Sequence, residues 1–416
     1  MSNLPKGWEE VQLDSVLEKF QNGYAFSSEG YVDSGIPIIS MANISLNGTF
    51  QYDYEKAKYW SSEELDNLKQ YQLNKGDLLI AMTDVTPDKK LIGRMAIVDI
   101  DDTFLLNQRV GLLKLKDSVN SKFLCEYGNF TVWRKYSKNV AALGAQANIS
   151  TKDIKNGRIP LPPLEEQKRI ADILSTVDKK IAFVEENISA TEELKKGLMQ
   201  KLLTEGIGHK EFKDSELGRI PESWEIKEIQ ESTDYVDYRG KTPTKTKNGI
   251  FLVTARNIKN NKIDYSLSEE FVSIEDYDNV MSRGLPKIGD ILLTTEAPLG
   301  EIAMVDREDI ALAQRIIKYR GKENILDNGY LKYCFLSSYF QKLLDLNSTG
   351  STVKGIKGSR LKKLNILIPP LEEQKQIAEI LSTVDKKLEN LKEKKQSFEE
   401  LKKGLMQKLL TGEVRV

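Results

Sequence analysis

The heptapeptide "PPLEEQK" occurs twice in this chain of 416 residues, at positions 162–168 and again at 369–375. When residues 162–204 are aligned with residues 369–411 without a gap, 31 of 43 positions are identical. Identity this high indicates an internal duplication, which has to be recognised before a fold can be predicted. The identical positions gather at the two ends of the aligned segment, whereas the middle differs.

The segments before the two heptapeptides also correspond, though more faintly. The pairs are "LPKGWEEVQL" (4–13) with "IPESWEIKEI" (220–229), "IISMANI" (38–44) with "LVTARNI" (252–258), "GDLLIAMT" (76–83) with "GDILLTTE" (289–296), and "LNQRVGLLK" (106–114) with "LAQRIIKYR" (312–320). The sequence therefore predicts globule, helix, globule, helix, with bounds at 1–160, 161–208, 209–368 and 369–416.

Each repeated segment is predicted to be a long helix. The two prolines stop a helix upstream, and Glu165 and Glu166 suit a first turn near the positive end of the helix dipole. Apolar residues then recur at steps of three and four, as in a coiled-coil seam, with a local irregularity at Thr191. The predicted pairing residues are Leu174, Val177, Ile181, Val184, Leu194 and Leu198 in the first copy, and Leu381, Val384, Leu388, Leu391, Leu401 and Leu405 in the second.

The length of these helices constrains the layout. A helix of about 40 residues spans about 60 Å, so it carries the chain away from the first globule. If the second helix pairs with the first, it runs back antiparallel to it. The predicted fold class is therefore α+β: two related mixed α/β globules joined by an antiparallel two-helix spacer, with an approximate two-fold axis and a nearly circular layout.

The globules themselves are predicted to contain many short strands. Apolar runs bounded by Gly, Asp and Asn are typical of strands, and they include "GIPIIS", "GDLLIAM", "RMAIVD" and "VGLLKLK" in the first globule and "GIFLVTA", "GDILLTT", "EIAMVD" and "RIIKYR" in the second. Trp8 and Trp224 each follow a turn that contains proline, and we interpret them as core anchors rather than base-stacking residues.

The composition favours a protein without an overall basic field. The chain has 61 Lys and Arg against 62 Asp and Glu, so any nucleic-acid binding has to rest on local patches. Cys125 and Cys334 have no motif spacing, and no stretch is apolar enough for a membrane span. The start "MSNLPKGWEE" does not resemble a signal peptide, and a cytoplasmic location is expected.

The sequence lacks the usual tools of an enzyme. The one histidine, His209, falls in a linker and is expected to be solvated. No cluster has metal-ligand spacing, and no phosphate-binding loop or S-adenosylmethionine fingerprint is present. Asp77 with the later run Asp88, Lys89 and Lys90 loosely resembles a nuclease motif, but a charged loop is the preferred interpretation. No catalytic or metal-binding residue is therefore predicted.

Two related globules on a fixed spacer suit the recognition of duplex DNA, because a two-fold protein axis can match the dyad of a duplex. Lys and Arg supply phosphate contacts, and polar side chains can read base edges. The candidate DNA-binding residues of the first globule are Tyr24, Ser27, Lys89, Lys90, Arg94, Arg134, Lys135 and Lys138. Those of the second are Arg239, Lys241, Thr242, Lys245, Lys247, Arg256, Lys354 and Lys357.

Taken together, these motifs make the chain resemble the DNA sequence-specificity (S) subunit of type I restriction–modification systems. The resemblance is carried by the two "PPLEEQK" helix starts, by "GDLLIAM" and "GDILLTT", by "NQR" and "AQR", by the "YRGKTP" loop at 238–243, and by "GAQANIS" (144–150) and "GSTVKGI" (350–356). It covers essentially the whole chain.

The resemblance implies that each globule is a target recognition domain for one half of a bipartite, asymmetric DNA site. The helices would set the half-site spacing and dock two modification (methyltransferase) subunits, which methylate an adenine in each half. Restriction–translocation subunits would complete the complex. No cofactor is expected on this chain, since S-adenosylmethionine, ATP and magnesium are used by the partner subunits. A stand-alone nuclease or methyltransferase and a purely structural coiled-coil scaffold remain the alternatives.

Overall fold

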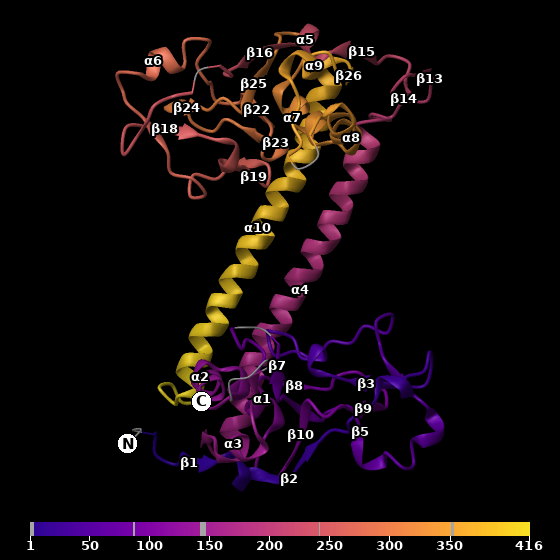
Figure 1. Cartoon of the computed structure of the whole chain (residues 1–416), viewed down its shortest axis with the longest axis vertical. Coiled ribbons are helices and arrows are strands. Elements are labelled where there is room, and N and C mark those ends of the chain that lie inside the picture. Colours follow the sequence, from indigo (N-terminus) through magenta and orange to yellow (C-terminus); the bar gives the residue numbers. More distant parts are fainter. Residues whose placement is uncertain (1–3, 86–87, 142–146, 241, 351–352) are drawn as a thin grey trace. The chain divides into compact units, whose positions relative to one another are not determined.

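The computed structural model describes residues 4–85, 88–141, 147–240, 242–350 and 353–416 (Figure 1). The chain divides into two compact units: unit 1 consists of Met1–Glu185 and Glu393–Val416, and unit 2 of Glu186–Lys392. Each unit contains one predicted globule and part of both long helices. The predicted mixed α/β composition is confirmed, while the predicted arrangement of the two globules relative to each other stays a prediction.

Unit 1 is built on two four-stranded sheets and two short ladders. The first sheet has the order β2 (Leu17–Asn22), β10 (Val110–Leu115), β6 (Leu78–Ala81), β8 (Met95–Ile97), all antiparallel. The second has the order β4 (Tyr59–Trp60), β3 (Ile36–Ile39), β9 (Phe104–Leu106), β5 (Gln72–Leu73), with β3 and β9 parallel. The ladders pair β1 (Glu9–Gln12) with β12 (Arg158–Leu161) and β7 (Thr83–Asp84) with β11 (Ala147–Asn148).

Unit 2 repeats this plan. Its first sheet has the order β16 (Thr233–Asp237), β25 (Ile316–Gly321), β22 (Ile291–Thr295), β23 (Leu299–Met304), and its second the order β17 (Lys245–Thr246), β21 (Phe271–Val272), β18 (Ile250–Val253), β24 (Ile310–Leu312). The ladders pair β15 (Glu225–Glu228) with β26 (Asn365–Ile368), β13 (Phe212–Ser215) with β14 (Gly218–Pro221), and β19 (Ile258–Lys259) with β20 (Lys262–Ile263). β18 and β24 run parallel, as β3 and β9 do.

The predicted strands of both globules are confirmed, and β6 and β22 show the physical cause most clearly. β6 and β22, which the "GDLLIAM" and "GDILLTT" runs form, are buried at every residue, because they lie inside their sheets between two partner strands. Continuous apolar runs are typical of strands that are covered on both faces.

Shorter helices complete each unit. In unit 1 these are α1 (Ser121–Asn129), α2 (Thr131–Val140) and α3 (Thr151–Asn156), with 3-10 turns η1 (Leu13–Val16), η2 (Ser28–Gly30), η3 (Met41–Asn43), η4 (Ser62–Glu64) and η5 (Lys69–Tyr71). In unit 2 they are α5 (Ile229–Ser232), α6 (Tyr277–Val280), α7 (Asn328–Leu336), α8 (Ser338–Asn347), α9 (Gly358–Leu361) and η6 (Ala255–Asn257).

The two long helices are α4 (Leu164–Leu202) and α10 (Leu371–Leu410), which confirms both predicted helices. Within unit 1, Lys402 Nζ lies 2.7 Å from Asp178 Oδ2, and Lys395 Nζ lies 2.8 Å from Glu185 Oε1. From Asp178 to Glu185 the chain advances seven residues along α4, whereas their partners, Lys402 and Lys395, go back seven residues along α10. The two helices are therefore antiparallel there.

Unit 2 holds the same antiparallel pairing. Lys195 Nζ lies 2.6 Å from Asp385 Oδ1, and Lys392 Nζ lies 2.9 Å from Glu192 Oε1. Lys195 and Asp385 are the repeat counterparts of Lys402 and Asp178, since both pairs are related by the 207-residue offset of the two heptapeptides.

The predicted seam was wrong at two positions. Leu194 and Leu401 are 52% and 48% exposed, whereas the lysines that follow them, Lys195 and Lys402, face the opposite helix. The predicted irregularity at Thr191 is also absent, because Thr191 is buried and the three-and-four spacing runs straight through it to Lys195. The sequence pattern followed the leucines, but the helix phase places the lysines in the seam, where carboxylates neutralise them.

The repeated heptapeptide fastens each helix to its globule. Gln167 is fully buried; its Nε2 donates to the carbonyls of Pro162 (2.8 Å) and Ser118 (3.2 Å), and its Oε1 accepts from the Asn120 amide (2.8 Å). Asn120 is the N-cap of α1. The glutamine therefore ties the start of α4 to the start of α1 by two hydrogen bonds, and the third bonds it to Pro162, directly after the preceding strand.

Gln374 makes the same three bonds in unit 2. Its Nε2 donates to the carbonyls of Pro369 (2.8 Å) and Ile325 (2.9 Å), and its Oε1 accepts from the amide of Asp327 (2.8 Å), the N-cap of α7. The sequence pattern did not predict this role, because two of the three partners of each glutamine lie almost fifty residues upstream.

The second glutamate of the heptapeptide binds the predicted core tryptophan. Trp8 Nε1 donates to Glu166 Oε2 at 3.1 Å, and Trp224 Nε1 donates to Glu373 Oε2 at 3.0 Å. Both tryptophans are buried, which confirms that they are core anchors. Glu166 and Glu373 are thus internal hydrogen-bond acceptors rather than simple first-turn charges.

The expectation that His209 is solvated was wrong. Its side chain is 22% exposed, its Nε2 is hydrogen-bonded to Glu373 Oε1 at 2.8 Å, and its ring packs edge-on against Trp224. In unit 1, Arg415 takes the corresponding place and holds both carboxylate oxygens of Glu166. The segment that follows each long helix therefore returns to the glutamate of the other helix.

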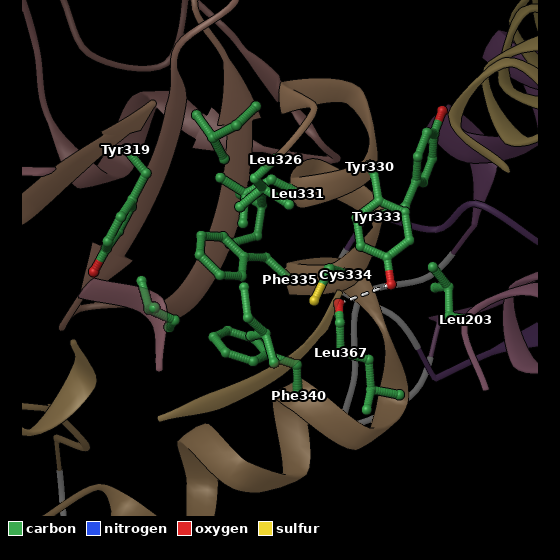
Figure 2. Close-up of a cluster of buried hydrophobic side chains, with 14 of the residues drawn as sticks. Leu203, Tyr319, Leu326, Tyr330, Leu331, Tyr333, Cys334, Phe335, Phe340 and Leu367 are labelled. Carbon is green, nitrogen blue, oxygen red and sulfur yellow. Dashed lines mark hydrogen bonds between the residues drawn. The ribbon is translucent and has the colours of Figure 1, made fainter. Parts of the chain in front are cut away.

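Each globule has its own hydrophobic core. In unit 2 the core includes Tyr319 on β25 and the α7 residues Tyr330 and Phe335, all with essentially no exposed surface. Figure 2 shows these rings gathered between the sheet and the helices, with Tyr330 Oη donating to the carbonyl of Leu367 at 3.1 Å.

Candidate nucleic-acid interface

Four loops meet at one end of the first sheet in unit 2, and we call their described residues the loop cluster of unit 2: 237–240 and 242, 296–298, 313–315, and 348–350 with 353–357. Thr242 Oγ1 donates to Gln314 Oε1 at 3.3 Å, and Arg315 Nε lies 2.7 Å from Glu296 Oε1. Glu296 also forms a β-bridge with Gly355. The cluster therefore joins segments that are more than one hundred residues apart in the sequence.

Arg239 connects the first loop with the last. Its guanidinium donates to both carboxylate oxygens of Asp237 and, from Nη1, to the carbonyl of Ile356 at 3.3 Å. The hydrogen bonds and charge of Asp237 raise the pKa of Arg239 although partial burial lowers it, so the group stays charged. Arg239 is half-buried and firmly positioned, which suits a residue that presents a fixed charge at the edge of the cluster.

The loop cluster of unit 1 comprises residues 22–27, 82–85, 107–109 and 147–151. The Gln108 amide donates to the Tyr24 carbonyl at 2.9 Å, and Thr83 Oγ1 donates to Asn148 Oδ1 at 2.9 Å. Thr151 Oγ1 bonds to Asn22 Oδ1 at 3.2 Å. This cluster is polar rather than basic.

The two clusters occupy equivalent places. Asn22 pairs with Gly111 at the end of β2, and Asp237 pairs with Ile317 at the end of β16, so Tyr24 in unit 1 corresponds to Arg239 in unit 2. Tyr24 is 37% exposed and packs edge-on against Phe26. The same backbone position thus carries an aromatic ring in unit 1 and a guanidinium in unit 2.

The remaining predicted cations of unit 2 differ in whether they form an ion pair with a carboxylate. Lys245 pairs with Glu270 at 2.8 Å, and Lys354 pairs with Asp345. Among the predicted cations of unit 2 that the structure describes, three are exposed and have no carboxylate partner: Lys247, Arg256 and Lys357. Lys241 lies outside the described residues.

The predicted basic group of unit 1 does come together, because residues 88–94 pack against α2. Three of its members, Lys89, Arg94 and Arg134, however, hold that loop in place. Lys89 Nζ donates to the carbonyls of Lys138 and Ala141, and Arg94 donates to the Lys90 carbonyl and to Asn129. Ser27 caps η2. Of the predicted cations of unit 1, Lys90 and Lys135 are exposed, and Lys90 pairs with Asp88 at 2.9 Å.

The prediction that Arg134 binds DNA was wrong. It is 7% exposed, and its guanidinium donates to the carbonyls of Ile92, Lys89 and Lys90. Burial lowers its pKa to about 10, with nearby Arg94 acting in the same direction. A guanidinium whose donors are used by the backbone cannot also reach a phosphate, so we omit Arg134 from the interface.

The sequence reasoning missed four residues of the clusters: Gln108, Arg109, Gln314 and Arg315. They lie directly before β10 and β25 in both units. The signal that could have found them was the repeated "QR" of "LNQRVGLLK" and "LAQRIIKYR", which was used to align the globules but not to select a site.

The acidic residues of the loosely nuclease-like string make structural contacts. Asp77 is hydrogen-bonded to Asn74 and Lys114, while Asp88 pairs with Lys90, so the two carboxylates serve separate structural contacts. The described residues contain no group of three or more His, Cys, Asp or Glu that could hold a metal ion. None of the helices described is both long enough and apolar enough to cross a bilayer.

A hollow of about 560 Å³ on unit 2 lies away from the candidate residues. It is lined by Asp234, Arg320, Gly321, Glu323, Asn324, Leu326, Asp327, Asn328 and Leu371. Its acids outnumber its one cation, and it includes no predicted DNA-binding residue. The hollow is therefore poorly suited to a phosphate backbone.

Comparisons with known proteins agree on one family. A family model described as "Type I restriction modification DNA specificity domain" matches residues 5–193 and 221–400. The putative type I restriction enzyme MjaX specificity subunit of Methanocaldococcus jannaschii is 30% identical over 431 residues, covering 100% of this chain and 96% of the relative. The EcoKI specificity subunit of Escherichia coli K12 is 22% identical, covering 90% and 81%.

Solved structures share the fold. The type I restriction–modification S subunit from M. genitalium superposes with a TM-score of 0.60 at 14% identity, covering 99% of this chain and 97% of that one. A chain from a study of complex assembly and conformational transition of the type I system gives a TM-score of 0.54 at 18% identity, covering 99% and 100%.

Proposed function

Since this chain belongs to the family of type I restriction–modification DNA specificity subunits, we propose that it recognises a bipartite DNA sequence, one half with each unit. As a specificity subunit it is a DNA-recognition component rather than an enzyme. The observation that carries the proposal is the pair of loop clusters. They lie at equivalent backbone positions in the two units but carry different side chains.

The divergence of the clusters supports an asymmetric site. Tyr24 and Arg239 occupy equivalent positions, as do Thr83 and Glu296 in the loops after β6 and β22. An arginine favours guanine or a phosphate, whereas a tyrosine offers a ring and a hydroxyl. Two frames that carry such different groups would read different half-sites.

The long helices support a role as a spacer. α4 has 39 residues and α10 has 40, and each is continuous. At 1.5 Å per residue each spans about 60 Å. We propose that they set the distance between the half-sites and dock two copies of a modification subunit, to which their closely similar surfaces are suited.

The chemistry would then reside in the partners. The modification subunits would bind S-adenosylmethionine and methylate one adenine in each half-site, and restriction–translocation subunits would use ATP and magnesium. The contribution of this chain would be to hold the target in register by phosphate and base-edge contacts.

Mapping of methylated adenines in host DNA, with and without this gene, tests the proposal. The expected result is one bipartite motif whose methylation disappears with the gene and returns with the intact gene. Methylation by the purified chain alone would instead support a stand-alone methyltransferase. If an assembled complex bound DNA without sequence preference, the scaffold alternative would replace the proposal.

A further inference from the structure

The Gln–Arg pair before β10 and β25 is duplicated, yet its side chains make no equivalent internal contacts in the two units. In unit 1 neither Gln108 nor Arg109 has a side-chain hydrogen bond or ion pair to any described residue, and Gln108 is exposed. In unit 2, Gln314 accepts a hydrogen bond from Thr242, and Arg315 pairs with Glu296. Position 296 corresponds to Thr83 in unit 1, so that ion pair cannot be repeated there.

Other duplicated polar residues behave in the opposite way. Gln167 and Gln374 make the same three hydrogen bonds, and Glu166 and Glu373 accept from equivalent tryptophans. Their repetition is explained by repeated internal contacts. The repetition of the Gln–Arg side chains is not explained in that way.

The backbone of the two loops is duplicated, so the side chains start from matching positions. The Asn107 amide donates to Ile39 at 3.0 Å, and the Ala313 amide donates to Val253 at 2.9 Å. The carbonyl of the arginine also accepts a main-chain bond in both units, from Met82 directly after β6 and from Thr295 at the end of β22. These bonds need no particular side chain at the glutamine position, which leaves its identity without an internal reason.

We propose that Gln108 and Gln314 each read an adenine edge in the major groove, at a base pair common to both half-sites. A glutamine side chain offers an NH2 group that can donate to N7 of adenine and a carbonyl oxygen that can accept from the N6 amino group. The glutamine, which is the same in both units, would read the base pair that the two half-sites share. The cluster residues that differ between the units would read the base pairs that differ.

The inference rests on the proposed function, because it assumes that each unit binds one half-site. The methylation map of the wild type supplies the motif and tests that function first. The assembled complex of this chain with its modification subunits is then titrated with duplexes in which each base pair of the motif is replaced in turn. Wild type is compared with Gln108→Ala, Gln314→Ala and the control Gln12→Ala, an exposed glutamine on β1 away from the cluster.

The expected result is position-specific. Gln108→Ala should lower the discrimination at one A·T pair in one half-site by roughly tenfold to a hundredfold, and Gln314→Ala should do the same at one A·T pair in the other half. Every other position, and the Gln12→Ala complex, should behave as wild type. Equal melting temperatures would show that the variants are folded.

Three outcomes would overturn the inference. They are an equal loss of affinity for all duplexes, a relaxed preference at a G·C pair, and no change at any position. Each leaves the proposed function intact, provided that the wild-type motif is bipartite and depends on this gene. A motif that is absent in the wild type would instead overturn the proposed function itself.

Discussion

Lys402 Nζ lies between two carboxylates, 2.7 Å from Asp178 Oδ2 and 3.1 Å from Glu126 Oε2, in the seam between α4 and α10. Lys402→Met should destabilise unit 1 by about 2 kcal/mol, because two acids would be left beside each other without their cation. The cost is kept below that of a fully buried pair since Asp178 is 38% exposed and partly screened.

Urea unfolding followed by unit-resolved hydrogen exchange measures this effect. The neighbouring exposed lysine provides a matched control, and Lys403→Met should change the stability of unit 1 by less than about 0.5 kcal/mol. Equal effects of the two variants would mean that the seam position of Lys402 has no energetic consequence.

A pH dependence is expected from Glu126. Burial raises its pKa from 4.5 to about 7, although Lys402 opposes the shift. The folded state therefore keeps a proton that the unfolded state has lost, so this contribution to stability is full below pH 4.5 and is lost as the pH rises towards 7. We expect the free energy of unfolding of unit 1 to fall by about 1–3 kcal/mol over that interval.

Glu126→Gln should remove this slope, and hydrogen exchange of α1 at several pH values would show it. Unit 2 supplies the internal control, because Tyr333 stands where unit 1 has Glu126 and bonds through its hydroxyl to Asp385 at 2.8 Å. A slope in unit 2 as steep as that in unit 1 would contradict the assignment.

The heptapeptide glutamines should be energetically important in their own units. Gln167→Ala is expected to destabilise unit 1, and Gln374→Ala unit 2, by about 1–3 kcal/mol, because buried backbone groups lose their partners. Lys168→Ala, which changes an exposed neighbour paired with Glu165, should have almost no effect. Unit-resolved hydrogen exchange is the measurement, and a glutamine variant as stable as the lysine variant would refute the prediction.

Phosphate contacts should lie with the unpaired cations. Replacing Lys247, Arg256 and Lys357 with Ala should weaken DNA binding by the assembled complex. The slope of log K against log salt should become less steep by about 0.9 for each phosphate that is no longer neutralised. Arg134→Lys is a comparison variant, because its buried guanidinium is used by backbone carbonyls and its replacement should affect stability rather than the salt slope. An unchanged slope in the triple variant would exclude these cations from the interface.

The spacer proposal predicts a ruler effect. Inserting three heptads into α4 between Glu185 and Glu186, and three into α10 between Lys392 and Glu393, keeps the seam phase and adds about 32 Å. That is close to the roughly 34 Å turn of B-DNA, so the methylated motif should keep both half-sites and gain roughly ten spacer base pairs.

A single heptad in each helix serves as the contrast. It adds about 10 Å, which turns the second half-site away from the protein, and methylation should fall sharply. An insertion that altered a half-site while leaving the spacer unchanged would refute the ruler.

Much of the fold could be predicted because it depends on local patterns. The two prolines end each globule, the period of three and four forms each helix, and the short apolar runs form the strands of both sheets. The error at Leu194 and Leu401 has a physical cause: Lys195 and Lys402 look like surface residues in a pattern, and only the facing aspartates make them suitable for a seam.

The candidate site was predicted less well. Charge selected Arg134, Lys89 and Arg94, which the fold uses for internal hydrogen bonds, and it passed over the uncharged Gln108 and Gln314. Whether a cation is free depends on the carbonyls and carboxylates around it, and these come from distant segments.

The sequence by itself determined the duplication, the two long helices and the family, because these depend on repeated local order along the chain. Only the tertiary structure decided what the repeats are for. Gln167 joins α4 to α1 because Asn120 and Ser118 lie within hydrogen-bond distance of it. The side chain of Gln108 has no hydrogen-bond partner among the described residues and can therefore bind a ligand at the loop cluster. Two glutamines that are each repeated along the chain differ only in their surroundings, and packing sets those surroundings.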